Sequence, residues 1–384
     1  MKPETWSMIK RLVGFDTTSR ESNLGLIEWV RDWLAGQGVQ TTLTYDASGT
    51  KANLFATIGE GARPGIVLSG HTDVVPVDGQ PWDTDPFKAV LREDRIFARG
   101  AADMKGFLGA VLAMTPRFLQ ARLDAPIHYS LSYDEEVGCI GVRGLIEDIV
   151  RRGIKPSGCI VGEPTDMQVV IANKGKRSFH CHVRGKEAHS AMTPAGVNAI
   201  EFAARIITHI RAIADRLRDE ETRDPMFDVP FTTLQTGVIT GGTAVNIVPR
   251  DCRFDFEFRY LPLADPDRLE REIRDYAESI VRNEMRAADP NTDVTISLKS
   301  EIPGLATGAD DRLSYLATAL ARNRQVAKVA YATEAGLFQR AGIPSIICGP
   351  GSISEAHKPN EFITLVQVEK CEAFLERLID ELGA

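Results

Sequence analysis

The sequence predicts an α/β protein in which a doubly wound, mainly parallel sheet is interrupted by an inserted, ferredoxin-like βαββαβ domain. Short apolar runs alternate with helical patterns toward both ends of the chain. The middle instead carries strands with strict apolar and polar alternation. The length, 384 residues, is more than one domain of ordinary size needs.

The elements of the larger domain follow one another as strand and helix. Apolar residues at helical spacing predict a helix around Leu26–Leu34, and a short apolar run predicts a strand over 66–70. A helix is expected from about Met104. Further elements are strands at 127–133, 158–162 and 343–348 and an amphipathic helix in the last twenty residues. This alternation is typical of a mainly parallel sheet with helices on both faces.

The middle of the chain has a different order. Phe179, Cys181 and Val183 alternate with polar residues, and the stretch 251–259 alternates just as strictly. A helix is expected from about Pro194 to Leu217 and a second one around residues 269–280. The remaining strands are expected at 234–240 and 294–298. The order βαββαβ predicts a domain at 177–300, inserted between 1–176 and 301–384.

Composition excludes several classes of protein. The chain has 45 Lys and Arg against 53 Asp and Glu, a formal net charge of −8, which argues against nucleic acid or an anionic membrane as a partner. No apolar run is long enough for a transmembrane helix, and Met1–Lys10 lacks the plan of a signal peptide. Six scattered cysteines without a CxxC pair are expected to be free thiols in the cytoplasm.

Three common catalytic motifs are missing from the sequence. No G-x-G-x-x-G follows a strand, so a dinucleotide fold has no support. Neither a phosphate-binding G-x-x-x-x-G-K-[ST] loop nor a G-x-S-x-G nucleophile elbow occurs. The chemistry must therefore come from other residues.

Histidines and carboxylates stand where predicted strands end. Ligands of open α/β sheets bind outside the carboxyl ends of the strands, so these side chains are expected to share one crevice. Two imidazoles and several carboxylates are a plausible two-metal site for a divalent cation such as zinc. The residues concerned are His71, Asp73, Asp103, Glu135, Glu136, Glu163 and His357.

Each of these residues also has an ordinary structural interpretation. An Asp before a helix is usually an N-cap, an adjacent Glu pair is usually surface charge, and a lone loop His is usually solvated. Taken singly, the structural interpretation is favoured each time. The coincidence of five sites at strand ends favours a functional site.

Four motifs in order make the chain similar to a known family. They are SGHTDVVPVDG (69–79), RGAADMKG (99–106), SYDEEVGCIG (132–141) and VGEPT (161–165). The chain resembles the di-zinc aminoacylase, carboxypeptidase and deacylase family over nearly its whole length. The resemblance implies a catalytic α/β domain with two divalent metals, zinc or cobalt, and an inserted lid or dimerisation domain.

The resemblance also implies a role for each candidate. His71 and Glu163 would bind one metal, His357 and Glu136 the other, and Asp103 would bridge them. The residues alone leave open which of the two adjacent glutamates is the base, and the resemblance assigns that role to Glu135. Asp73 would orient His71 through its carboxylate. The peptide bond between Asp103 and Met104 would be cis.

A second set of residues is implied in the inserted domain and beside it. His189 would reach the active site of the partner subunit in a homodimer and, with Asn246, support the oxyanion. Arg259 would bind the substrate carboxylate, and Gly336 would shape the acyl-amino-acid pocket. His180 and His182, an H-x-H pair, are instead expected on the polar face of a strand.

The choice among family members depends on longer segments. Residues 173–201, 232–249 and 349–363 are most similar to members that remove the acetyl group from N2-acetyl-L-ornithine in arginine biosynthesis. Hydrolysis of succinyl-diaminopimelate, acetylcitrulline or a broader range of N-acyl amino acids is the alternative. A non-catalytic homologue is disfavoured because every metal and base position is filled.

Overall fold

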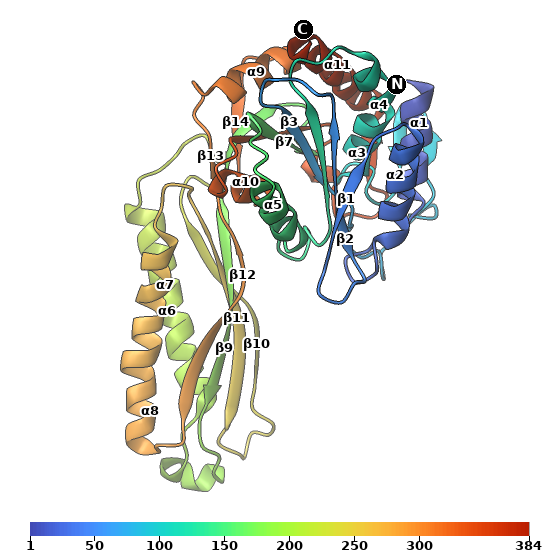
Figure 1. Cartoon of the computed structure of the whole chain (residues 1–384). Helices are drawn as coiled ribbons and strands as arrows, with labels where there is room; N and C mark the ends of the chain where they lie inside the picture. The colour runs from blue at the N-terminus through green and yellow to red at the C-terminus, as the bar shows by residue number, and fades with distance from the viewer. Residues whose placement is uncertain (384) are drawn as a thin grey trace. The chain divides into compact units, whose positions relative to one another are not determined.

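The computed structural model describes residues 1–383, which form two compact units (Figure 1). The first unit comprises Met1–Ala172, Leu305–Lys328 and the residues from Thr333 onward. The second comprises Asn173–Gly304 and Val329–Ala332. The sequence predicted an insertion at 177–300. Each unit is described by itself.

The first unit is built on a nine-stranded sheet. Four central strands are parallel neighbours in the order β6 (Ile127–Ser132), β3 (Ile66–His71), β7 (Gly158–Pro164) and β15 (Ser345–Gly349). Antiparallel strands extend both sides of this centre. They are β1 (Thr41–Tyr45), β2 (Ala52–Ile58) and β8 (Val169–Asn173), with β13 (Leu305–Ala306) and β14 (Val326–Val329) paired to β8.

Helices cover both faces of this sheet, which confirms the predicted doubly wound α/β class (Figure 1). Leu68 and Ile160 of the sheet share one apolar cluster with Phe107 and Phe374 of the helices. The helices near that cluster are α1 (Pro3–Val13), α2 (Leu24–Gly36), α3 (Lys105–Ala113), α4 (Thr115–Gln120), α9 (Arg312–Ala321) and α11 (Leu365–Leu382). On the opposite face lie α5 (Gly141–Arg151) and α10 (Ala335–Arg340).

Several elements of the first unit lie outside the predicted set. They include α1, β1, β2 and a small sheet of β4 (Val90–Arg92), β5 (Arg95–Phe97) and β16 (Phe362–Thr364). The three strands of the small sheet have only three residues each, too few to show a period. A short 3-10 turn, η3 (Ile353–Glu355), precedes His357.

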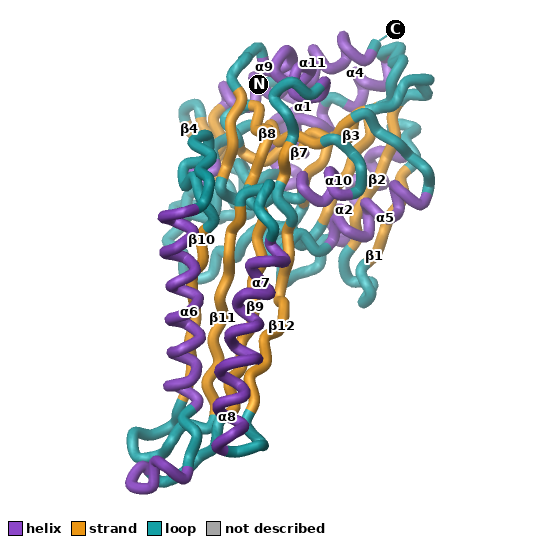
Figure 2. Tube along the Cα trace, turned by 90° about the vertical axis from the view of Figure 1, so that its left-hand side faces the viewer, coloured by secondary structure: helices purple, strands orange, loops and turns teal. Residues whose placement is uncertain are grey.

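The second unit has the predicted βαββαβ order. Its antiparallel sheet runs β10 (Thr233–Gly241), β11 (Asp251–Tyr260), β9 (Gly175–Arg184) and β12 (Asp293–Ile302). The helices lie along this sheet (Figure 2). They are α6 (Ala199–Glu220) and the continuous helix formed by α7 (Pro266–Asp275), the π-helical turn η2 (Tyr276–Val281) and α8 (Arg282–Ala288).

The apolar face of this sheet carries the alternating residues that predicted it. Phe179, Phe254 and Phe258 are buried against Ile206 and Ile273 of the two helices. The ring of Phe179 stacks on that of Phe256, with centroids 4.9 Å apart. Burial of such aromatic faces supplies most of the free energy that holds a two-layer unit together.

The predicted start of α6 near Pro194 was wrong. Residues Ser190–Ala195 form a separate 3-10 turn, η1, and α6 begins at Ala199. The side chain of Asn198 accepts hydrogen bonds from the amides of Ile200 and Glu201, which is the geometry of an N-cap. Asn in such a position is a stronger helix start than Pro194, which lies in the preceding turn.

Three further expectations concern membrane-spanning helices, the cysteines and one peptide bond. In residues 1–383 no helix is both long enough and apolar enough to cross a membrane. All six cysteines are buried and free, and the bond between Asp103 and Met104 is cis, as expected.

Candidate metal centre

The parallel strands bring the predicted residues to one edge of the sheet. His71 is the last residue of β3 and pairs in register with Ser132, the last residue of β6. Glu135 follows β6 after a short turn, and Glu163 lies near the end of the neighbouring β7. These carboxyl ends meet because the strands run in the same direction.

Asp103 lies between the two histidines. Its Oδ1 is 3.0 Å from Nε2 of His71, and its Oδ2 is 3.4 Å from Nε2 of His357. One carboxylate thus presents one oxygen to each imidazole. This is the arrangement expected of a carboxylate that bridges two cations.

Each histidine also faces one further carboxylate. Nε2 of His71 is 3.8 Å from Oε1 of Glu163, and Nε2 of His357 is 3.1 Å from Oε2 of Glu136. The structure therefore brings together all five residues predicted to hold metals. They form two half-sites that share Asp103.

The donor set suits two divalent cations. Imidazole nitrogens and carboxylate oxygens are the ligands that zinc and similar ions take in catalytic sites. Oε1 of Glu163 is buried without a hydrogen-bond donor among residues 1–383, as an oxygen reserved for a cation would be. Ligand atoms of His71, Glu135 and Glu163, and those of His71, Asp103 and Glu136, lie within 4.8 Å of one another.

The charges of the cluster also favour the binding of cations. Burial raises the pKa of Glu163 well above its usual value, and the negative charge of Asp103 adds to this shift. Burial and the charge of Asp103 likewise raise the pKa of Glu136. Hydrogen bonds to Asp103 and Glu136 raise the pKa of His357 to about 10. Divalent cations would compensate this excess of negative charge.

Asp103 and His71 each shift the pKa of the other. Burial raises the pKa of Asp103, but hydrogen bonds with His357 and His71 outweigh burial and lower it. Burial lowers the pKa of His71, yet hydrogen bonds with Asp103 and Asp73 raise it well above its usual value. Asp103 is thus the carboxylate of the cluster that stays ionised most readily.

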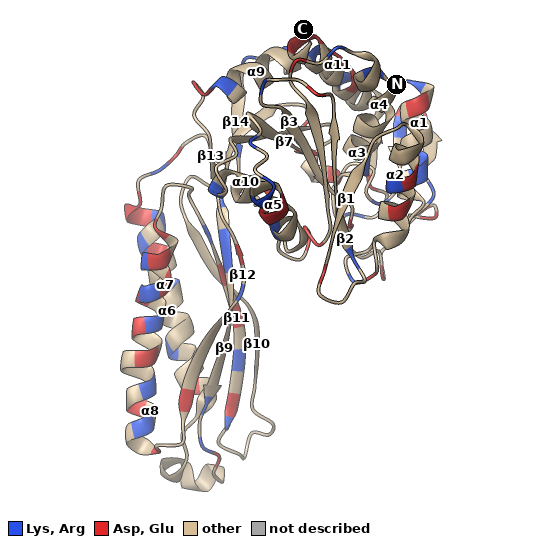
Figure 3. Ribbon diagram, in the orientation of Figure 1, with Lys and Arg blue, Asp and Glu red and all other residues tan. Residues whose placement is uncertain are grey.

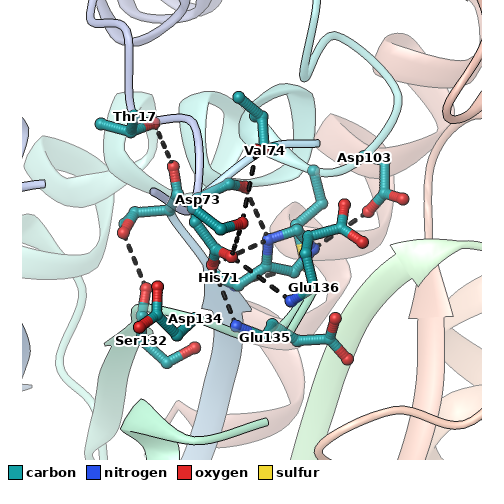
Figure 4. A network of polar contacts seen from close by, with 12 residues as sticks. Thr17, His71, Asp73, Val74, Asp103, Ser132, Asp134, Glu135 and Glu136 are labelled. Atoms are coloured by element: carbon teal, nitrogen blue, oxygen red, sulfur yellow. Dashed lines mark hydrogen bonds and ion pairs between the residues drawn. The ribbon is translucent and has the colours of Figure 1, made fainter. Parts of the chain in front are cut away.

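Asp73 connects β3 to the turn that carries the two glutamates (Figure 4). Its backbone carbonyl, 2.9 Å from Nδ1 of His71, is closer to that imidazole than its carboxylate, which is 3.6 Å away. The carboxylate instead accepts hydrogen bonds from the amides of Glu135 (3.1 Å) and Glu136 (3.3 Å) and from the hydroxyl of Ser19 (2.8 Å). The predicted contact between the Asp73 carboxylate and His71 is therefore longer than the carbonyl contact, and the carboxylate bonds mainly to the glutamate turn.

The turn from Asp134 to Cys139 directs the two glutamates differently. Asp134 and Cys139, at its two ends, have φ values of 55° and 52°, in the left-handed region that residues other than glycine seldom adopt. Within this turn Glu136 faces His357, whereas Oε1 of Glu135 lies 3.2 Å from the thiol of Cys139. Burial raises the pKa of Glu135 to about 8, and the charges of Glu136 and Asp103 contribute.

The other predicted site residues are placed as follows. Gly336 is buried in the first turn of α10 in the first unit. His189, Asn246 and Arg259 belong to the second unit. The side chain of His189 is exposed, and its Nδ1 accepts a hydrogen bond from the amide of Ala191.

His189 and Asn246 are neighbours within the second unit. The amide of Ser190 donates to the carbonyl of Asn246 across 3.0 Å, and His189 forms a β-bridge with Ile247. Arg259, on the polar face of β11, donates from Nε to Glu257 across 3.2 Å.

The H-x-H pair does not form a metal site. His180 bonds to Asp255 and His182 to Asp251, each across 2.7 Å, on the polar face of β9 and β11. Both therefore have the structural role that the alternation predicted.

Sequence reasoning missed two buried carboxylates next to the site. Glu334 is fully buried, and its two oxygens accept hydrogen bonds from Ser69 (2.5 Å) and Ser132 (2.8 Å), near the ends of β3 and β6. Glu361 is equally buried and bonds to the loop that precedes Asp103. In the sequence both look like ordinary surface charge, and only an apolar or Gly-rich neighbourhood could have drawn attention to them.

Comparison with known proteins gives two kinds of match. The model of peptidase family M20/M25/M40 matches residues 67–381. An acetylornithine deacetylase of Myxococcus xanthus is 34% identical over 383 residues, covering 98% of this chain and 97% of the relative. An acetylornithine deacetylase of Pasteurella multocida is 32% identical over 94% of this chain and 92% of the relative.

Solved structures share the fold at lower identity. An M20 family metallo-carboxypeptidase of Sulfolobus solfataricus has a TM-score of 0.78 at 20% identity, with 99% of both chains covered. A Bacillus subtilis protein described as a dinuclear metal-binding M20 peptidase has a TM-score of 0.66 at 15% identity, covering 98% of this chain and 97% of its own.

Proposed function

This chain belongs to peptidase family M20/M25/M40 and is a metal-dependent amide hydrolase, and we propose that it converts N2-acetyl-L-ornithine to L-ornithine and acetate. The observation that carries the proposal is Asp103, whose two oxygens face His71 and His357, in a chain whose curated relatives are acetylornithine deacetylases. The reaction would serve arginine biosynthesis.

We assign one cation to His71, Asp103 and Glu163 and the other to His357, Asp103 and Glu136. Zinc suits these ligands, and cobalt fits them equally. Bound cations of this kind polarise the scissile carbonyl and lower the pKa of water toward neutrality.

Glu135 is the residue proposed to move the proton. Other residues serve as ligands in the assignment above, and a carboxylate oxygen of Glu135 lies within 4.8 Å of ligand atoms of His71 and Glu163. A buried carboxylate beside two cations suits a group that takes a proton from water and passes it to the leaving amine. The hydrogen bonds that the backbone amides of Glu135 and Glu136 donate to the carboxylate of Asp73 hold the turn that carries the base and the neighbouring ligand.

The second unit is proposed to recognise the substrate. Arg259 would bind the α-carboxylate, for which a planar guanidinium is the best partner. His189, reaching the site of the neighbouring subunit, and Asn246 would stabilise the oxyanion. The loops that carry these two residues are adjacent, because the amide of Ser190 donates a hydrogen bond to the carbonyl of Asn246. This proximity supports a shared role. Gly336 would shape the wall of the acyl-amino-acid pocket.

A homodimer through the second unit is part of this proposal. Strand β10 is an edge of its sheet, and Val238 and Ile239 on it are 59% and 54% exposed. Val245 and Ile247 of the following loop are exposed as well. An exposed apolar edge strand is a typical surface for pairing with a second copy.

We place the enzyme in the cytoplasm and expect no nucleic-acid partner. Six buried cysteines without a disulfide suit a reducing compartment. Along α6, α7 and α8 basic residues are interspersed with acidic ones instead of forming one positive surface (Figure 3).

A substrate panel tests the proposal. Zinc-loaded protein is expected to have its highest kcat/KM on N2-acetyl-L-ornithine, with lower values on acetylcitrulline and succinyl-diaminopimelate. The variant Glu135→Gln tests the role of the base, because glutamine keeps the size of the side chain and cannot accept the proton from water. It is expected to lose about 10²–10⁴-fold in kcat.

The panel also separates the alternatives. A higher kcat/KM on another acyl amino acid would assign the enzyme to that substrate and contradict the proposal. Absence of hydrolysis by the zinc-loaded wild type would indicate a non-catalytic homologue.

A further inference from the structure

The loop that carries Asp103 is held by one buried carboxylate. Oε1 of Glu361 accepts hydrogen bonds from the amides of Ala102 (2.8 Å) and Asp103 (3.1 Å). Its Oε2 accepts from the amide of Gly100 (3.0 Å) and from Nη1 of Arg99 (2.7 Å). Glu361 therefore receives four donors, all from residues 99–103.

This carboxylate lies in the protein interior. The side chains of Glu361 and Arg99 are each 1% exposed. A buried ion pair is costly to form unless hydrogen bonds satisfy both partners. Here they satisfy both carboxylate oxygens of Glu361, whereas Nε of Arg99 is buried without an acceptor among residues 1–383. Such an arrangement is weak evidence for stability, but it defines one geometry of the loop.

Arg99 extends the same network to the loop of His357. Its Nη2 donates to Oε1 of Gln80 across 2.6 Å, and Nε2 of Gln80 donates to the backbone carbonyl of His357 across 3.2 Å. Nη1 of Arg99 also donates to the carbonyl of Lys358 across 3.2 Å. His357 has a φ of 62°, a conformation that such neighbours help to maintain.

We propose that Glu361 is a positioning residue that, through Arg99 and Gln80, fixes the distance between Asp103 and His357 and so sets the spacing of the two metals. The inference rests on the metal ligands of the proposed function. Glu361 itself contacts neither metal nor substrate, because its oxygens are occupied by the loop. Its effect on the reaction is indirect, through the direction of the Asp103 carboxylate.

The chemistry of the site explains why a carboxylate is required. Glu361 presents two acceptors to two pairs of donors. A glutamine in its place must turn its NH2 group toward one pair, whichever way the amide is flipped, so donors would face donors. It would also leave the guanidinium of Arg99 buried without its counter-charge.

The test is zinc titration of the metal-free full-length protein, followed by cobalt absorption spectra of the loaded forms. Wild type is expected to bind two ions. Glu361→Gln is expected to bind both about 10–100-fold more weakly, because they share Asp103, and to change the cobalt spectrum. The side chain of Gln80 is partly exposed, and Gln80→Ala is expected to lower the affinity for only one of the two ions.

Glu355→Gln is the matched control. Glu355 lies two residues from His357, and its carboxylate contacts the hydroxyl of Ser354, so zinc affinity is expected to stay at the wild-type value. Circular dichroism of each metal-free variant separates weakened binding from loss of the fold. If Glu361→Gln does not fold, Gln80→Ala decides the outcome.

The outcomes distinguish this inference from the proposed function. If the wild type does not bind two ions, the proposed function fails. If the wild type binds two ions and a folded Glu361→Gln variant binds them with the same affinities and spectrum, the positioning role is overturned. Unchanged binding by Gln80→Ala overturns the connection to His357.

Discussion

The thiol of Cys139 lies 3.2 Å from Oε1 of Glu135. Burial raises the pKa of Cys139 well above its usual value, so the thiol keeps its proton and donates a hydrogen bond to the carboxyl group. The two residues belong to the same turn, in which the amide of Cys139 also donates to the carbonyl of Glu135. The side chain of the proposed base is thereby directed by its own turn.

The first prediction concerns this contact. Cys139→Ala is expected to lower kcat about 3–5-fold with little change in KM, because a neutral hydrogen bond contributes about 1 kcal/mol. Cys139→Ser keeps a donor and is expected to stay closer to wild type. Cys371→Ala, a buried cysteine of α11, controls for the loss of volume. Equal effects of the Ala and Ser variants at position 139 would argue against the contact.

The second prediction concerns metal and pH. The pKa of Glu135 is raised from 4.5 to about 8 in the folded metal-free protein, so the folded state holds a proton that the unfolded chain has lost between these values. The free energy of unfolding of the metal-free protein therefore falls as pH rises across this interval. Zinc relieves the repulsion and competes with protons, so its effect on Tm is expected to be larger at about pH 8 than at about pH 6.

Thermal unfolding with and without zinc, at both pH values, checks this prediction. Chelator-treated protein is the reference at each pH, and returned zinc should restore both Tm and activity. A Tm increase that is equal or larger at the lower pH would contradict the assignment of the cluster to a metal.

The third prediction concerns His128, on β6. Burial lowers its pKa to about 4, the positive charge of Arg152 adds to this, and its Nδ1 lies 2.9 Å from the hydroxyl of Thr57. Between this pKa and the usual 6.5 the unfolded chain binds a proton that the folded state does not. Stability is therefore lost as pH falls through that interval.

His128→Gln, which keeps a polar group beside Thr57, should remove this dependence. Urea unfolding of the metal-free proteins at about pH 7 and about pH 5 is expected to show an extra loss of about 2 kcal/mol in wild type. Parallel pH dependences of the two proteins would show that His128 titrates normally.

The fourth prediction concerns Gly162, the residue before Glu163 on β7. A Cβ at this position would lie 2.1 Å from Cδ1 of Phe107 in the buried helix α3. Gly162→Ala is expected to lower the free energy of unfolding by about 1–3 kcal/mol through overpacking.

The matched control for this substitution is Gly36→Ala in α2. A Cβ at Gly36 meets nothing within 4 Å, so the change is expected to be neutral or stabilising by about 0.5–1 kcal/mol. Denaturant unfolding of the three proteins checks both expectations. Equal stability of the two variants would contradict the packing argument.

The fold was predictable where the sequence repeats a period. Phe254, Phe256 and Phe258 alternate strictly, and they lie on the buried face of β11 as expected. Strands too short for a period, such as β4, and half-exposed strands such as β1, with its threonines, were not predicted. The N-cap of α6 is Asn198 and the helix does not start near Pro194, because a cap is decided by local hydrogen bonds.

The site was predictable where residues follow strands. His71 and Glu163 needed only the rule that parallel strands end at one edge. Glu361 gave no such signal, because its partners Ala102 and Asp103 lie 259 and 258 residues away in the sequence. Whether a loop carboxylate is buried depends on which distant loop covers it.

The way the second unit joins the chain has a consequence for evolution. The chain leaves the larger sheet at the end of β8 and returns to it in β13, and these two strands are neighbours. Asn173 and Gly304 lie so close that a Cβ on Gly304 would be 2.9 Å from the carbonyl oxygen of Asn173. A segment with adjacent ends can be lengthened, shortened or exchanged for another fold without altering the strand order that carries the metal ligands. The substrate contacts and the subunit interface that we propose for the second unit could therefore diversify while the strands that carry the metal ligands are inherited unchanged.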